Sequence, residues 1–132
     1  MIANQVKGCG FRGALKYVLD KEHKPEIIGG NMIFRDAQNL ANEFGISREL
    51  RPSLKKAVYH ASLSVTQNER LTNEQWENIS EKYLTSMGFI DNQYIAVRHA
   101  DKDHDHIHII ASRISMNGKV VSDSNDYKRS AQ

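Results

Sequence analysis

The chain has 132 residues, of which 39% are hydrophobic and 26% charged, and its formal net charge is +2. This length supports one domain with a real core, and the small positive charge permits a nucleic-acid partner without requiring one. No apolar run approaches the ~20 residues of a membrane span, the N-terminus has no export signal, and the single Cys9 excludes an internal disulfide. We therefore expect a cytoplasmic protein without membrane insertion.

The start of the chain predicts a strand followed by a helix. Residues 1–6 read as a strand, and residues 11–22 place apolar side chains at helical spacing. Tyr17 lies about 120° around that helix from the centre of the apolar stripe, at ~100° per residue. A tyrosine in this position either packs half-exposed against its neighbours or is free to act as a nucleophile.

A second extended segment and a second helix follow. Residues 25–34 are extended, and the pair Gly29–Gly30 within them indicates a turn or a bulge. Residues 35–45 predict a helix that is capped by Asp36 and stopped by Gly45.

The middle of the chain contains the element with the strongest local signals. Residues 55–65 alternate like a strand, and residues 71–88 predict a helix. Thr72 and Gln75 have the spacing of a capping box, and the apolar face begins at Trp76, which we expect to be buried.

The last third predicts strands. Residues 92–99 and 106–114 read as two strands joined by the polar loop 100–105, and an Asn-Gly step within residues 116–119 predicts a further hairpin. The whole order of elements is typical of the α+β class. We expect a largely antiparallel, five-stranded sheet with the helices packed on one side.

Four of the six histidines fall within residues 98–113. Because side chains alternate along a strand, His104, His106 and His108 would share one face. Neighbours about 7 Å apart at the backbone can converge on one ion, whereas residues about 13.5 Å apart do so poorly. We expect the third ligand from the preceding strand, which the loop folds back. The spacing thus predicts a divalent-metal site of His99, His106 and His108, with His104 at the loop edge.

The other residues near this motif leave alternatives open. Ile107 and Ile109 point to the opposite face and should enter the core. The histidines could instead form a solvated cluster on an exposed sheet face. Asp101 is either a hydrogen-bond partner of a ligand imidazole or a plain loop residue. His23 reads as a solvated loop residue, and His60 as a hydrogen-bonded face residue or a DNA contact.

The segment "HADKDHDHIHI", residues 99–109, resembles the His-hydrophobic-His (HUH) motif of relaxases, most closely that of the mobilisation-protein branch. The likeness covers most of the chain in the family's order. Residues 10–22 resemble the N-terminal segment that carries the tyrosine nucleophile, residues 60–89 resemble the middle segment with its Leu-Ser strand end, and residues 117–130 resemble the sequence after the metal motif.

This resemblance implies an enzyme, a relaxase that nicks and rejoins DNA at a specific site and strand to start plasmid mobilisation or conjugative transfer. It implies a tyrosine that forms a covalent 5′-phosphotyrosine intermediate with the help of one divalent metal ion. Mg or Mn is expected in the cell, and histidine nitrogens also suit Zn, Ni or Co. The implied partners are single-stranded DNA at an origin of transfer and accessory relaxosome proteins.

The resemblance also implies a fold and a domain organisation. The expected fold is the relaxase palm, a relative of the ferredoxin and RRM folds. We expect one catalytic domain over residues 1–132, either complete or the N-terminal part of a longer protein. Two positions depart from the family's motif, because Asp105 and Ser112 stand where many relatives have proline and asparagine.

Functional roles carry over residue by residue. Tyr17 matches the nucleophile, and the three histidines named above match the metal ligands. Asp101 matches the motif's acid, which would help take the phenolic proton, directly or through a histidine. Ser64, and with it Ser62, matches a serine region that meets DNA near the nick. Several cations are further candidates for phosphate contacts, or are ordinary surface charges: Arg12, Lys16, Lys55, Lys56, Arg98 and Arg113.

Two other functions fit the same motif. Replication-initiator nucleases share it but usually place the tyrosine after the histidines, and here Tyr17 precedes them. A non-catalytic, metal-stabilised DNA-binding module would need a closed, four-coordinate site, with His104 or Asp101 as the fourth ligand. Tyr94 and Tyr127 are the alternative candidates for the nucleophile.

Overall fold

The computed structural model describes residues 1–66 and 68–122. Its elements in chain order are β1 (Ile2–Gly8), α1 (Phe11–Val18), a short 3-10 helix η1 (Lys21–His23), β2 (Pro25–Gly30), α2 (Ala37–Arg48), β3 (Val58–Ser64), α3 (Asn73–Ser86), β4 (Asn92–His99) and β5 (His106–Ser115). Within these residues, no helix has the length and apolar character that crossing a membrane requires.

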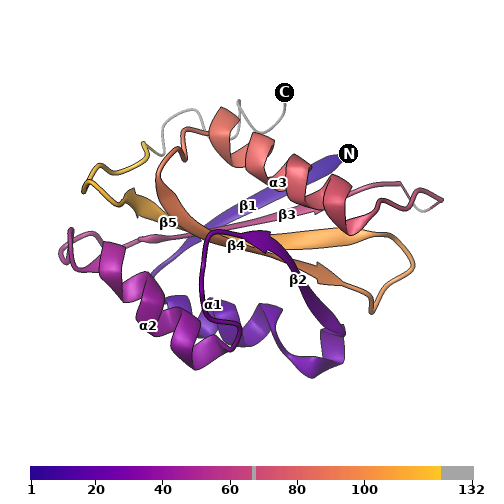
Figure 1. Ribbon diagram of the computed structural model, residues 1–132, viewed down its shortest axis with the longest axis horizontal. Helices are drawn as coiled ribbons and strands as arrows, with labels where there is room; N and C mark the ends of the chain where they lie inside the picture. Colours follow the sequence, from indigo (N-terminus) through magenta and orange to yellow (C-terminus); the bar gives the residue numbers. More distant parts are fainter. Residues whose placement is uncertain (67, 123–132) are drawn as a thin grey trace.

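The strands form one five-stranded sheet in the order β1-β3-β5-β4-β2, and every neighbouring pair is antiparallel. The long strand β5 occupies the centre, with β3 and β4 on either side of it, and β1 and β2 form the edges (Figure 1). This confirms the predicted α+β class and the five-stranded antiparallel sheet.

The helices cover both faces of this sheet, which differs from the expected packing on one side. Figure 1 shows α3 above the sheet and α1 with α2 below it. The reason lies in the central strands, which are apolar on both faces. Ile107 and Ile109 of β5 join the core around Trp76 of α3, whereas Ile110 and Ile114 join the core under α1 and α2. A sheet that is apolar on both faces must be covered on both.

Local signals in the sequence account for most of the helix ends. Asp36 accepts a hydrogen bond from the Asn39 amide and caps α2, and Thr72 and Gln75 form the predicted capping box of α3. The stop predicted at Gly45 is wrong, because α2 continues to Arg48. The helix extends because the buried Ser47 hydroxyl bonds to Gln93 and Ser112, so tertiary contacts hold the last turn.

Two glycine-containing segments adjust the strands. The register of β2 shifts between Ile27 and Gly29, which confirms a bulge. Gly30 has φ +128, and a Cβ there would lie 2.5 Å from the Tyr94 carbonyl oxygen, so only glycine fits. The hairpin expected at residues 116–119 is reduced to a single bridge between Ile114 and Val120.

The buried carboxylate of Asp105 joins the start of β5 to the start of α3. It accepts hydrogen bonds from the Leu71 amide at 2.8 Å and from the Trp76 indole at 3.0 Å, and it pairs with the Arg98 guanidinium at 2.7 Å. Burial by itself would raise the pKa of Asp105, but the hydrogen bonds from Leu71, Trp76 and Arg98 outweigh burial, and the pKa lies below its ordinary value. Asp105 is therefore an ionised anchor of the fold, on the face opposite the histidines.

We predict that Asp105→Ala lowers the free energy of unfolding by about 3 kcal/mol, because it leaves a buried indole and an amide without their acceptor and removes the carboxylate that pairs with Arg98. Urea unfolding followed by Trp76 fluorescence measures this change. Asp103→Ala is the matched control, since Asp103 is exposed in the same loop, and should change stability by less than about 0.5 kcal/mol. Equal stabilities for the two variants would contradict this role.

Candidate active site

The antiparallel register of β4 and β5 brings three histidines together. His99 ends β4 and pairs directly with His106, the first residue of β5, and His108 lies two residues further along the same face. One ring nitrogen of each imidazole lies within 4.8 Å of one from each of the other two. The convergence expected from the spacing is thus present, whereas the role of the three as metal ligands stays a prediction.

The second ring nitrogens of His99 and His106 each have a backbone hydrogen-bond partner. His99 Nε2 lies 2.7 Å from the Val18 carbonyl oxygen, and His106 Nδ1 lies 3.2 Å from the His104 carbonyl oxygen. Because a carbonyl only accepts, these nitrogens carry the protons, and His99 Nδ1 and His106 Nε2 keep their lone pairs for the cluster. Neutral imidazoles held in this way are the usual donor set for a divalent ion, so the residues present fit a metal.

Burial keeps these imidazoles neutral. Burial is the main cause that lowers the pKa of His99 and of His106 below the ordinary histidine value. For His108, burial and then the neighbouring imidazoles lower the pKa to about 3. All three rings are therefore neutral at physiological pH, and a neutral imidazole, with one nitrogen free of a proton, is the form that binds metal.

Tyr17 lies beside this cluster at the end of α1. Phe11, Leu15 and Val18 bury the apolar stripe of the helix, while Tyr17 is 52% exposed, as its position off the stripe predicted. Its ring centroid lies 4.9 Å from that of His23 and 6.0 Å from that of His108. The hydrogen bond from His99 to the Val18 carbonyl ties the last turn of this helix to the histidine cluster.

His23 is a member of the site that sequence reasoning placed in a solvated loop. Its Nδ1 lies 2.8 Å from a carboxylate oxygen of Asp101, and its ring stacks on His99 with 4.6 Å between centroids. The bond to His23 is the main cause that lowers the pKa of Asp101. The sequence offered one signal that His23 lies near the site: only the end of α1 and a short turn separate it from Tyr17.

His60 is the second residue whose place the sequence left open. It lies on β3, and its Nε2 is 2.8 Å from Nδ1 of His108. Burial lowers the pKa of His60, so this ring is also neutral. The signal in the sequence was its spacing from Ser62 and Ser64, because residues two apart on a strand share one face.

The side chains of this site, His60 excepted, line a cavity of ≈ 220 Å³. Tyr17, Asp101, Ser62 and Ser64 all border it together with the three clustered histidines. His104, expected at the loop edge of the metal site, also borders it, and three lining residues had no predicted role in the chemistry: Asn4, His23 and Lys102. The structure thus brings the predicted nucleophile, acid, serines and histidines to one place.

None of the six cations that the sequence suggested as phosphate contacts borders this cavity. Arg98 faces α3, where Asp105 and the Leu71 carbonyl hold it. Arg113 is buried and donates to the carbonyls of Lys56 and Val121. Arg12 and Lys16 are exposed on α1. The two arginines in the strands are therefore engaged in the fold.

The alternative tyrosines do not join the cluster in the described part of the chain. Tyr94 packs against the core beneath α3, and burial is the main cause that raises its pKa. Tyr127 lies outside the described residues.

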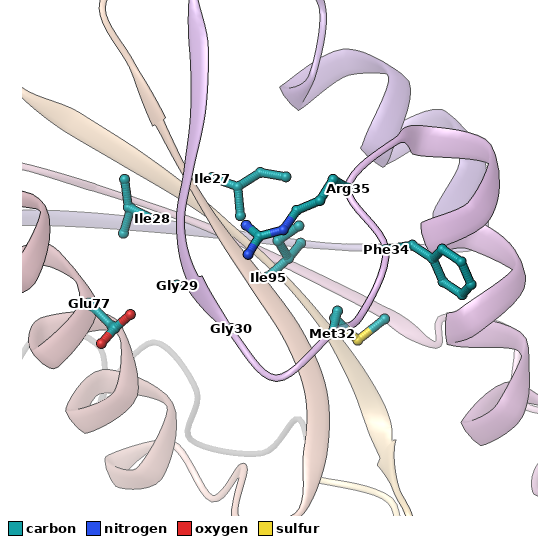
Figure 2. A pocket seen from close by; sticks show the side chains of 9 residues that line it. All are labelled: Ile27, Ile28, Gly29, Gly30, Met32, Phe34, Arg35, Glu77 and Ile95. Atoms are coloured by element: carbon teal, nitrogen blue, oxygen red, sulfur yellow. The ribbon is translucent and has the colours of Figure 1, made fainter.

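A second cavity, of ≈ 170 Å³, lies beside the glycine bulge of β2. Figure 2 shows Arg35 and Glu77 on opposite sides of the Gly29–Gly30 segment, and Ile27 and Ile95 also line the cavity. This cavity shares no lining residue with the histidine cavity. It is therefore a separate feature of the edge of the sheet.

Comparison with known proteins agrees with this geometry. A family model described as "Relaxase: MobA/VirD2-like, nuclease domain" matches residues 17–132, which include Tyr17, Asp101 and the three clustered histidines. A search of curated proteins finds no significant match. Because the family model covers most of the chain, the chain belongs to the MobA/VirD2-like relaxase nuclease-domain family, whose activity class is the nicking of DNA in mobilisation.

Proposed function

We propose that this chain is a metal-dependent relaxase that nicks and rejoins one strand of DNA at a specific site through a covalent bond to Tyr17. The observation that carries the proposal is the meeting of three neutral histidines, on strands β4 and β5, with a half-exposed tyrosine from α1. A site of this composition combines a nucleophile with a place for a Lewis acid.

His99, His106 and His108 would hold one divalent ion. When bound, such an ion supplies Lewis-acid stabilisation of the negative charge on the scissile phosphate. Mg or Mn is the expected ion in the cell, and Zn, Ni or Co also suits imidazole ligands. In the described part of the chain, the trio of His99, His106 and His108 includes neither His104 nor Asp101, whereas Asp101 belongs to a second possible ligand group with His23 and His99. This supports an open coordination position, as catalysis requires, over the closed site of a binding module.

Tyr17 is the proposed nucleophile. Its phenolic oxygen forms a bond to phosphorus while the bond from phosphorus to the 3′-oxygen breaks, which leaves a 3′-hydroxyl and a 5′-phosphotyrosine. The phenolic proton departs to a base, and the 3′-oxygen takes up a proton. The reverse sequence rejoins the strand. A free phenol has a pKa of about 10 and is poorly ionised at neutral pH, so Tyr17 needs such a base.

Asp101 acts through His23 in this proposal. The carboxylate holds His23 by Nδ1, which leaves Nε2 of the same ring to accept a proton. The rings of Tyr17 and His23 meet edge-on, so the imidazole of His23 lies next to the phenol of Tyr17. Asp101 thus orients His23 as the base that takes the phenolic proton.

The substrate is single-stranded DNA at an origin of transfer, and the expected partners are accessory relaxosome proteins. Ser62 and Ser64 line the histidine cavity, and we expect their hydroxyls to donate to phosphate oxygens of the strand near the nick.

We predict that the purified chain binds one Co²⁺ ion and that His106→Ala and His108→Ala each weaken binding more than about 100-fold, because a direct ligand should cost more than an outer-shell partner. Isothermal titration calorimetry measures the affinity. His104→Ala is the matched control, since it removes a neighbouring imidazole outside the trio and keeps the backbone acceptor of His106. Chelation with excess EDTA should also stop nicking, and cleavage that persists undiminished would contradict the metal requirement.

We predict that Tyr17→Phe abolishes the covalent protein–DNA adduct while leaving the fold and Co²⁺ binding unchanged, because the ring and its packing remain. The assay uses single-stranded DNA with a candidate origin sequence and detects the adduct by denaturing electrophoresis. Tyr94→Phe is the control and should keep full adduct formation. An adduct with Tyr17→Phe that is lost in Tyr94→Phe or Tyr127→Phe would show that the nucleophile is another tyrosine.

We predict that Asp101→Ala and His23→Ala each slow adduct formation about 100-fold, the range of general acid–base catalysis. Because the two residues act as one unit, the double variant should be no slower than either single variant. Single-turnover kinetics with the same DNA measures the rates, and Asp103→Ala in the same loop is the control. Additive losses in the double variant would mean that the residues act independently.

A further inference from the structure

We propose that His60 is a positioning residue that holds His108 in the tautomer that binds metal. This inference rests on the proposed metal site and extends it to a residue outside the three ligands. Its basis is the 2.8 Å contact between His60 Nε2 and His108 Nδ1, two side-chain nitrogens that belong to strands paired in the sheet.

The geometry of the sheet makes this contact specific. His108 pairs directly with Ser62, and His60 pairs with Ile110, so His60 and His108 are diagonal neighbours on one face. Their ring centroids lie 5.1 Å apart. Both side chains are half-buried, which limits the competition of water for the hydrogen bond.

The direction of the hydrogen bond follows from the metal-binding role. If His108 offers Nε2 to the ion as a neutral ring, its proton is on Nδ1. That proton is donated to His60 Nε2, and His60 carries its own proton on Nδ1. The other two ligands meet backbone carbonyls, from Val18 and His104, which can only accept. Among the three proposed ligands, His108 is therefore the one whose orientation depends on a side chain, that of His60, which a substitution can change.

The chain offers a matched set of variants for a test. His60→Gln keeps an acceptor close to the position of Nε2, and His60→Leu fills the same space without an acceptor. Tyr59→Phe, on the next residue of β3, removes a hydroxyl that bonds to Gln5 on the other face of the sheet. It reports the effect of a lost buried hydrogen bond on the same strand away from the metal site.

Co²⁺ binding to the full chain, measured by isothermal titration calorimetry, tests the proposal, with urea unfolding as a check on each variant. We expect His60→Leu to weaken Co²⁺ binding about 10- to 100-fold, the usual cost of losing an outer-shell partner. His60→Gln should restore most of the affinity, and Tyr59→Phe should bind as the wild type does. Unchanged affinity in a folded His60→Leu, or equal losses in the Gln and Leu variants, would overturn the proposal.

A second measurement needs no variant. Nitrogen-15 NMR of the histidine rings in the Zn²⁺-loaded wild-type chain should show His108 protonated at Nδ1 and His60 protonated at Nδ1 with Nε2 bare. A proton on Nε2 of His60 would overturn the inference while leaving the metal site intact. A wild-type chain that binds neither Co²⁺ nor Zn²⁺ would instead overturn the metal site of the proposed function, and this inference with it.

Discussion

The candidate site depends on the register between β4 and β5. This register sets His99 opposite His106 and leaves His108 on the same face. A slip of one residue would turn every side chain of a strand to the other face, and the histidines would then exchange places with Ile107 and Ile109. The register is held because both faces are in use: the isoleucines fill the core beneath α3, and Asp105 binds the first turn of α3 from the residue just before His106.

The proposed nucleophile, Tyr17, and the histidine cluster are coupled through α1. His99 uses one nitrogen for the cluster and the other for the carbonyl of Val18, the residue next to Tyr17. The same helix is fixed from its other end, where Phe11 stacks on Phe44 of α2 with 4.4 Å between the rings. The position of Tyr17 relative to the cluster is therefore set by helix packing as well as by a polar contact, and a shift of α1 would move both.

Burying this many imidazoles is costly unless each polar nitrogen has a partner. Each of the three clustered rings has one nitrogen bonded to Val18, His104 or His60. Burial keeps the rings neutral, and their remaining lone pairs are concentrated in one small volume. An ion that accepts these lone pairs would complete the group, which is why the polar arrangement reads as a site rather than as a packing defect.

The sequence by itself determined the features that depend on neighbours along the chain. The alternation from His104 to Ile110, the capping box of α3 and the position of Tyr17 off its stripe are set by local periodicity. Other features were decided only by tertiary structure, because they join residues far apart in sequence. The partner of Asp101 is 78 residues away and that of His108 is 48 residues away, and no periodicity reports such pairs. The same holds for the placing of α3 opposite α1 and α2, which required the sheet to be apolar on both faces. The charge of Arg98 and Arg113, which makes them candidates for phosphate contacts, is visible in the sequence, whereas the acceptors that engage them are visible only in the folded chain.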